Sequence, residues 1–242
     1  HSIDKSSPSS FDSLSGTPRE GSKQHYLINS LMEEAIASSQ LEGAATTRQV
    51  AKKFLREGKK PRNNSEKMIL NNFRTISKLK ALKDQPLTKD LILEIHHEIC
   101  RGTLDEESDE SDFRTTNDIV VQDKTDYTPV YYPPDFTEIP VMLEGVCDFA
   151  NNHDRFIHPI IKAIILHFLI GFIHPFNDGN GRTARALFYW YALKNHYDLF
   201  EYLSISRIFI HSPARYSMAY LYTETDNNDL TYFLDFNIEI IK

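Results

Sequence analysis

The sequence predicts a mainly helical domain that carries one short β-hairpin. Apolar residues recur at helical spacing in most of the 242 residues, and the only convincing strand pattern lies within residues 118–132. Hydrophobic residues make up 40% of the chain, which is enough to bury a substantial core. Strands and helices do not alternate, so we expect no doubly wound nucleotide-binding sheet.

The N-terminal part divides into an arm and a helical region. Residues 1–24 are rich in Ser, Pro, Gly and Lys without an apolar period, which predicts a flexible arm. Residues 25–85 form the predicted N-terminal helical region. Its first helix starts near His25 and stops at Gly43, and the next two are expected at 47–56, ended by Gly58, and at 65–82, capped by Ser65.

We expect the core domain at residues 86–242, after Pro86 breaks the chain. Thr88 can cap a helix whose inner stripe is Leu91, Ile95 and Ile99. The acidic run 105–112 predicts a solvated loop. Strands are expected at 118–121 and 127–132 around a turn at 122–126, and further helices at 137–151, 159–173, 180–194, 213–225 and 230–241.

Composition argues against several classes of partner. The formal net charge of −7 speaks against long-range attraction to nucleic acid or anionic membrane. Two cysteines, Cys100 and Cys147, are too few for a disulfide framework and lack the spacing of a zinc site. No apolar run has the length of a membrane span, and the polar start at 1–21 does not have the pattern of a signal peptide. We therefore expect a cytoplasmic protein.

The chemistry concentrates after the helix 159–173, which is apolar almost all round and must be buried. The polar segment His174-Pro-Phe-Asn-Asp-Gly-Asn-Gly-Arg182 follows, and a new helix opens behind it. Gly179 and Gly181 let main-chain N–H groups approach an anion at that helix N-terminus. The guanidinium groups of Arg182 and Arg185, three residues apart, suit a polyphosphate, and Asp178 offers an oxygen ligand for Mg²⁺ shared with phosphate.

Each of these residues taken alone has a plainer interpretation. A histidine after an apolar helix is usually structural, glycine pairs usually make turns, and Arg182 and Arg185 could be surface charges. No Gly-Lys-Ser/Thr follows the first glycine, so the segment is not a Walker A loop. The joint spacing is what favours a phosphate site.

Residues 174–185 resemble the Fic signature, His-Pro-Phe-x-Asp/Glu-Gly-Asn-Gly-Arg-x-x-Arg, at every defined position. The similarity extends over roughly residues 30–240, including Phe113-Arg-Thr before the hairpin, the helix segment from Lys162-Ala to His167, and Asp229-Leu-Thr in the tail. In the related Doc group a lysine replaces the second glycine. Gly181 therefore favours AMP transfer over kinase activity.

The resemblance implies roles for the signature residues. His174 would be the general base that accepts a proton from a Ser, Thr or Tyr hydroxyl attacking the α-phosphate of ATP. Asp178 would hold Mg²⁺ or Mn²⁺. The other implied nucleotide contacts are Gly179, Asn180 and Gly181 around the developing charge, Arg182 and Arg185 on the triphosphate, and Tyr216 against adenine, although Ser217 stands where a second tyrosine is common.

Ser38-Ser-Gln-Leu-Glu42-Gly43 resembles the inhibitory sequence of the same family, Ser/Thr-x-x-x-Glu-Gly/Asn. The spacing of four puts Ser38 and Glu42 on one helical face. In the family this glutamate pairs with the second signature arginine, here Arg185, and blocks the γ-phosphate. The resemblance also implies that the hairpin 119–132 (Ile119 to Tyr132) positions a target protein by strand pairing.

Several alternatives stay open at this stage. Glu42 could also position a water that removes AMP from a modified protein, or the chain could be a non-enzymatic nucleotide sensor. A metal-dependent phosphohydrolase built on His174 and Asp178 lacks further ligands at interpretable spacing. Four further histidines are interpreted mainly as structural: His96, His97, His158 and His167. The target, its acceptor residue and homo-oligomerisation are open, and we expect no nucleic-acid or membrane partner.

Overall fold

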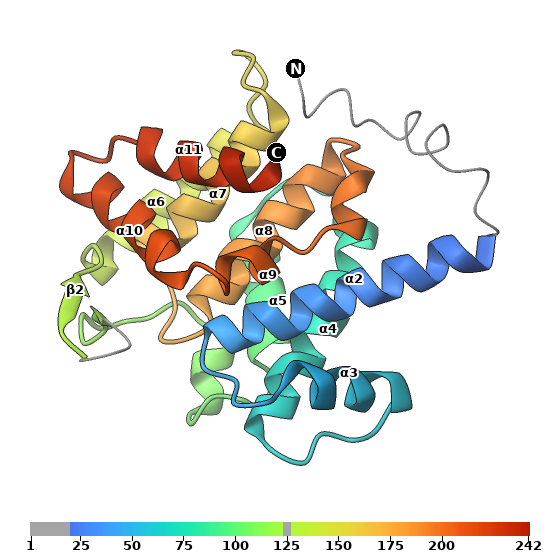
Figure 1. The fold of residues 1–242 in the computed structure, drawn as a ribbon. Coiled ribbons are helices and arrows are strands. Elements are labelled where there is room, and N and C mark those ends of the chain that lie inside the picture. Colours follow the sequence, from blue (N-terminus) through green and yellow to red (C-terminus); the bar gives the residue numbers. More distant parts are fainter. Residues whose placement is uncertain (1–19, 123–126) are drawn as a thin grey trace.

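Two adjacent helices, α7 (Pro159–Ile173) and α8 (Asn180–Lys194), pack side by side at the centre of the structure (Figure 1). The computed structural model describes residues 20–122 and 127–242. No residue of α7 is exposed, as its apolar sequence predicts. In α8 every residue except Gly181 and Lys194 is buried, although the helix carries Arg182 and Arg185. The surface-charge interpretation of these arginines is therefore wrong.

The other helices surround this pair. The long helix α2 (Glu20–Leu41) crosses one side of α8 (Figure 1) and rests on α4 (Asn64–Leu82) and on the short α3 (Arg48–Glu57). Further contacts on the central pair are made by α5 (Lys89–Cys100) and α4 on α8, and by α6 (Ile139–Asn151), α10 (Pro213–Thr225) and α11 (Thr231–Ile241) on α7. The fold is thus mainly α, as predicted.

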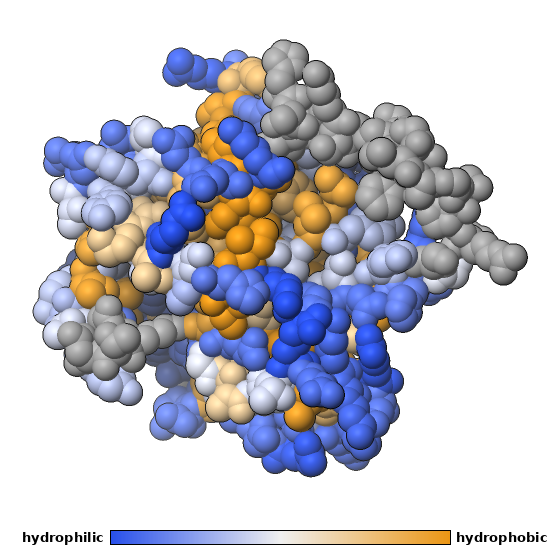
Figure 2. All heavy atoms as spheres, in the orientation of Figure 1, coloured by the Kyte–Doolittle hydropathy of each residue, from blue (hydrophilic) through white to orange (hydrophobic). Residues whose placement is uncertain are grey.

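The space-filling view separates two kinds of surface. Figure 2 shows hydrophilic side chains over α2 and α3, and a band of hydrophobic side chains through the upper centre, where α7, α8 and α11 lie in Figure 1. In the described part of the chain, every helix is too short or too polar to span a membrane. Cys100 and Cys147 are both free thiols.

Local signals set several helix ends as predicted. The Thr47 side chain caps α3 by accepting from the Val50 N–H, and Gly58 ends that helix at φ 61°. Thr88 caps α5 through the Leu91 N–H at 3.1 Å. The predicted helices 159–173 and 180–194 are confirmed at their bounds.

Two helix starts differ from the prediction. Helix α2 begins at Glu20 and not near His25, because its first turns are largely exposed (Tyr26 is 66% exposed) and need no apolar period. Helix α4 is capped by Asn63, whose side chain accepts from the Glu66 N–H, whereas Ser65 accepts from the Ala45 N–H and so ties α4 to the end of α2. Residues 1–19 of the predicted arm lie outside the described residues.

The hairpin is shorter than expected. Its strands are β1 (Val121–Gln122) and β2 (Pro129–Tyr131), paired antiparallel with Val121 opposite Tyr131 and an irregularity in register. Pro129 cannot donate to the ladder, which limits pairing. The predicted turn at 122–126 lies outside the described residues beyond Gln122. A hairpin this short depends on the helices beside it.

The chain also forms elements that the sequence did not predict. Short helices appear as η2 (Glu107–Glu110), η3 (Phe136–Glu138), η4 (Asp198–Tyr202) and α9 (Ile205–Phe209). The acidic run is not simply a solvated loop, because Glu110 is buried and accepts from the Gly102 N–H at 2.5 Å. Asp109 accepts from Asn177 at 2.8 Å, which ties the acidic run to the polar segment after α7.

Candidate active site

His174 is the residue at which α7 ends. Its backbone is left-handed, at φ 49° and ψ 58°, and its N–H closes the last turn on the Ile170 carbonyl. The imidazole Nδ1 lies 3.0 Å from the Gly171 carbonyl oxygen. A carbonyl only accepts, so Nδ1 carries the proton and Nε2 keeps its lone pair. Burial lowers the pKa of His174, although the Gly171 carbonyl and the Glu42 carboxylate oppose this shift. The side chain is therefore a neutral base.

The segment after His174 is held by its own asparagine. Asn180 accepts from the Phe176 N–H at 2.9 Å and donates to the Phe176 carbonyl at 2.8 Å. Gly179 is the N-cap of α8 at φ 81°, a conformation that favours glycine. The side chain of Asn180 thus shapes the loop, and only its main-chain N–H, in the first turn of α8, remains for an anion.

Asp178 is the exposed carboxylate of this loop. One oxygen accepts from the Gly179 N–H at 2.5 Å, the other lies 3.5 Å from Arg182 Nη2, and the side chain is 59% exposed. No cluster of three or more His, Cys, Asp or Glu side chains that could hold a metal occurs among the described residues. A single exposed carboxylate suits Mg²⁺ or Mn²⁺ that completes its coordination with phosphate oxygens and water.

The two signature arginines contact different helices. Arg182 points to α5, where Nη1 donates to the Ile99 carbonyl at 3.4 Å and Nη2 lies 3.8 Å from Cys100 Sγ. Arg185 points to α2 instead. The spacing of three residues predicts one helical face for both arginines, yet their guanidinium groups contact different helices, because α8 is enclosed on both sides.

Arg185 binds both residues of the predicted inhibitory sequence. Its Nε donates to Ser38 Oγ at 2.8 Å, and Nη2 donates to the Ser38 carbonyl at 2.9 Å and to Glu42 Oε1 at 2.8 Å. Burial alone would lower the pKa of Arg185, but Glu42, together with Tyr216 and Glu34, raises this pKa overall. Nη1 is buried without a hydrogen-bond partner among the described residues. The ion pair therefore leaves one donor for another anion.

The absence of a side chain at Gly181 leaves room for the Glu42 carboxylate. A Cβ at Gly181 would lie 2.2 Å from Glu42 Oε1 and 3.1 Å from Arg185 Nη1. The carboxylate thus lies against the first turn of α8, on the side where the N-terminus of the helix favours negative charge. Glu42 occupies space that a phosphate group on Gly181 and Arg185 would need.

Tyr216 lies next to this group, and part of its ring surface is covered by other side chains. Its ring stacks on Phe209 with centroids 4.5 Å apart, and its hydroxyl lies 2.9 Å from His167 Nε2. Burial raises the pKa of Tyr216 and lowers that of the fully buried His167. His167 is thus a structural partner of Tyr216, in line with the sequence interpretation. The contact of Tyr216 with adenine stays a prediction.

Arg114 connects the hairpin to the site, a role that the sequence interpretation did not assign. This buried side chain donates from Nε to the His174 carbonyl at 2.9 Å and from Nη2 to the Pro134 carbonyl beyond β2. Tyr131 of β2 donates to the Phe172 carbonyl of α7 at 3.0 Å. The only sequence signal was its place in Phe113-Arg-Thr, because the partners are main-chain oxygens that no side-chain pattern shows.

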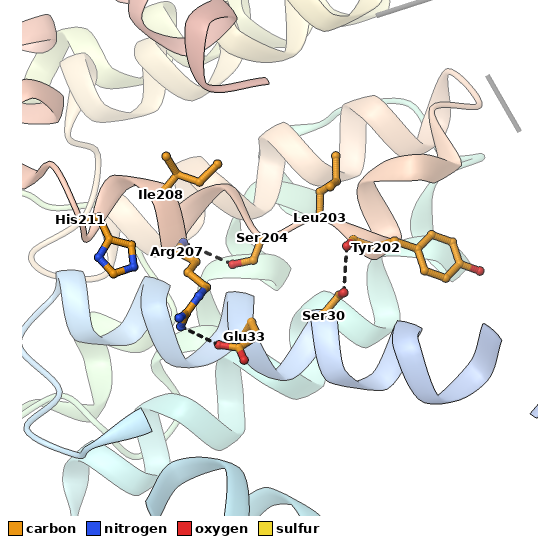
Figure 3. A pocket seen from close by; sticks show the side chains of 8 residues that line it. All are labelled: Ser30, Glu33, Tyr202, Leu203, Ser204, Arg207, Ile208 and His211. Atoms are coloured by element: carbon orange, nitrogen blue, oxygen red, sulfur yellow. Dashed lines mark hydrogen bonds and ion pairs between the residues drawn. The ribbon is translucent and has the colours of Figure 1, made fainter. Parts of the chain in front are cut away.

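A shallow pocket of about 350 Å³ lies away from these residues, where α2 meets α9 (Figure 3). There Arg207 pairs with Glu33 at 3.0 Å, and Ser30 donates to the Tyr202 carbonyl at 2.8 Å. Lys52 and Arg48 also pair with Glu33. Burial would raise the pKa of Glu33, but these cations lower it to about 2. The pocket therefore lies at an interface that holds α2 in position, and α2 is the helix that carries Ser38.

Comparisons with known proteins agree with this geometry. Residues 86–192 match the model of the Fic/DOC family. A protein from Nematostella vectensis named protein adenylyltransferase Fic is 27% identical over 167 residues, which cover 68% of this chain and 37% of the relative. Protein adenylyltransferase fic-1 of Caenorhabditis elegans is 35% identical over 99 residues, 40% of this chain and 18% of that protein. The chain thus spans well under half the length of these relatives.

Solved structures share the fold. A Fic family protein from Desulfovibrio desulfuricans G20 superposes with a TM-score of 0.74 at 22% identity, over 88% of this chain and 62% of that one. A Fic domain containing signaling protein from Bacteroides thetaiotaomicron VPI-5482 gives a TM-score of 0.72 at 22% identity, over 100% of this chain and 92% of the other. The chain thus shares the fold of these Fic proteins, and its residues 86–192 are similar to the Fic domain of the Fic/DOC family.

Proposed function

We propose that this chain is a protein adenylyltransferase, which transfers AMP from ATP to a Ser, Thr or Tyr hydroxyl of a target protein. Relatives named protein adenylyltransferase Fic support this activity. The observation that carries it is the state of His174, whose Nδ1 is bound to the Gly171 carbonyl so that Nε2 can accept a proton beside the N-terminus of α8.

In the proposed reaction the target hydroxyl oxygen attacks the α-phosphorus of ATP. Its proton passes to Nε2 of His174 as the new O–P bond forms. The bond from the α-phosphorus to the bridging oxygen breaks, and pyrophosphate leaves. The main-chain N–H groups of Asn180 and Gly181, in the first turn of α8, are proposed to stabilise the developing negative charge, and that of Gly179 would join them once the Asp178 carboxylate releases it.

The triphosphate is proposed to bind along the loop and the two arginines. The unpartnered Nη1 of Arg185 can donate to a phosphate oxygen, and Arg182 backs the loop from the α5 side. Asp178 would hold Mg²⁺ or Mn²⁺, which supplies positive charge to the phosphates. The exposed part of Tyr216 is proposed to contact the adenine, and the hairpin 119–132 to pair with the target segment.

We further propose that Glu42 is an inhibitory residue. Its carboxylate is paired with Arg185 and lies against Gly181, so a phosphate must displace it. The pair is partly buried, which makes the contact stronger than an exposed ion pair.

We also propose that the protein is located in the cytoplasm, because of its composition and its two free thiols.

The test is labelling from ATP that is radioactive at the α-phosphate, in Mg²⁺ or Mn²⁺. Three chains are compared: wild type, Glu42→Gly, and Glu42→Gly with His174→Asn, because asparagine tolerates the left-handed backbone of residue 174. We expect strong labelling of the chain itself or of lysate proteins by Glu42→Gly, weak labelling by wild type and none by the double variant.

Other outcomes select the alternatives. ATP binding without labelling in any variant would replace the transferase with a nucleotide sensor. Release of AMP from labelled protein by wild type, lost in Glu42→Gly, would add removal of AMP to the activity, since Glu42 would then be positioning a water.

A further inference from the structure

Helix α5 packs against the loop that precedes α8, and its residue His96 contacts this loop most closely. The imidazole is fully buried and stacks on Phe176 with centroids 3.6 Å apart and an interplanar angle of 3°. Its Nε2 lies 2.9 Å from the carbonyl oxygen of Asp178. Because a carbonyl only accepts, His96 donates from Nε2.

This hydrogen bond fixes the direction of a peptide group. A trans peptide is planar, and its C=O and N–H point in opposite directions. Among the described residues no peptide bond is cis. With the Asp178 carbonyl turned to α5, the N–H of Gly179 must point away from α5, where it meets the Asp178 carboxylate at 2.5 Å.

The loop cannot hold this orientation through Gly179 itself, which has the conformational freedom of glycine. It lies close to α5, since a Cβ there would come within 2.3 Å of Cys100 Sγ and 3.1 Å of His96 Nε2. Burial raises the pKa of the Cys100 thiol to about 12, so Cys100 packs as a neutral group and exerts no charge on the loop. The oriented donor on this side of the peptide is His96.

We propose that His96 is a positioning residue of the nucleotide site: by holding the Asp178 carbonyl, it directs the Gly179 N–H to the Asp178 carboxylate and so fixes that carboxylate for the metal ion of the bound polyphosphate. The proposal rests on the proposed function only in that the loop binds the phosphates of ATP. His96 itself touches neither substrate nor reacting atoms.

The experiment separates the donor from the stacked ring. In the Glu42→Gly chain, His96→Phe keeps a flat ring on Phe176 but removes the donor, whereas His96→Gln restores an N–H donor without the ring. We expect His96→Phe to weaken ATP binding in calorimetry, and to raise KM for ATP, by roughly threefold to tenfold, the range for one lost hydrogen bond. We expect kcat to change less, and His96→Gln to stay within about twofold of the parent.

A purely structural role predicts the opposite order. If His96→Gln binds ATP as weakly as His96→Phe or more weakly, the proposal is overturned. His97→Phe is the matched control, because His97 is the next residue of α5 and no hydrogen bond joins its ring to the loop in the described structure. It is expected to leave binding and KM unchanged.

Two further readouts keep the outcomes distinct. If Glu42→Gly binds ATP but transfers no AMP, the proposed function fails, and calorimetry still decides the role of His96. If it does not bind ATP at all, both proposals fall. Should the variants not fold, NMR of the ¹⁵N-labelled wild type must show an exchange-protected Nε2–H from His96, and its absence would refute the positioning bond.

Discussion

Tyr189 donates a hydrogen bond of 2.8 Å to the buried carboxylate of Glu34, one helical turn from the place where Arg185 donates to Ser38. From Glu34 to Ser38 the residues of α2 rise by four while their partners on α8 fall by four, from Tyr189 to Arg185, so the two helices run antiparallel here. Glu42, just beyond the end of α2, shares Arg185 with Ser38. The Tyr189 contact therefore fixes the register that presents Glu42 to Arg185.

Tyr189→Phe is expected to loosen this register without touching the nucleotide site. It removes the hydrogen bond to Glu34 and also the one that the hydroxyl accepts from the Ile205 N–H, so the free energy of unfolding should fall by about 1 to 3 kcal/mol in urea titration. AMP transfer by the otherwise wild-type chain should rise several-fold and stay below that of Glu42→Gly. Tyr191→Phe is the control, since that ring lies by Lys162 and not by α2. Unchanged transfer despite lower stability would exclude a role in placing Glu42.

Gly181→Ala tests whether phosphate shares the space of Glu42. In the Glu42→Gly chain the competing carboxylate is gone, and a Cβ at residue 181 would still fill the position next to Arg185 Nη1. We expect roughly tenfold weaker ATP binding in calorimetry, equal to about 1.4 kcal/mol. Gly145→Ala on α6, where a Cβ meets no atom within 4 Å, should change nothing. Equal affinities for both variants would place the phosphates elsewhere.

Substitutions of His174 should separate backbone strain from chemistry. Its φ of 49° is tolerated by asparagine and disfavoured for alanine. Both His174→Asn and His174→Ala should abolish AMP transfer, because each removes the Nε2 base. Only His174→Ala should lower stability, by about 1 to 2 kcal/mol in thermal or urea unfolding. Transfer that survives in a folded His174→Asn chain would point to another base.

Stability should fall as the pH drops below about 6.5, the ordinary pKa of histidine. Burial lowers the pKa of His96 to about 4, and lowers those of His167 and His174 as well. The unfolded chain therefore binds protons that the folded chain excludes, which favours unfolding. For His96 this amounts to about 1.4 kcal/mol at pH 5.5, and His167 and His174 act in the same direction.

Urea unfolding of a Glu224→Gln chain at pH 7.5, 6.5 and 5.5 measures this effect. The substitution is needed because burial raises the pKa of Glu224 to about 7, so its protonation in the folded chain would oppose the effect of the histidines. The stability lost in this range is retained at pH 7.5, where both states carry neutral imidazoles. A free energy of unfolding that does not change between pH 7.5 and 5.5 would show that these side chains are accessible to protons in the folded state.

Local sequence signals were most reliable where a side chain hydrogen-bonds to a residue close to it in the sequence. Thr47 and Thr88 cap helices by accepting from an N–H three residues on, a bond that needs nothing from the rest of the fold. The spacing of Ser38 and Glu42 likewise put both on one helical face, and both contact Arg185. The sequence overestimated the length of the hairpin strands. The apolar residues near 118–121 pair only where the surrounding helices and Pro129 allow it.

The sequence by itself determined the helical fold class, the buried helix α7 and the signature segment from His174 to Arg185, since these follow from apolar period, caps and residue order. Only the tertiary structure decided that α8 is enclosed, so that Arg182 turns to α5 and Arg185 to α2. It also decided that His96 holds the loop. Such contacts join residues far apart in the chain, and burial and hydrogen bonding at these points depend on which helices meet there and not on local spacing.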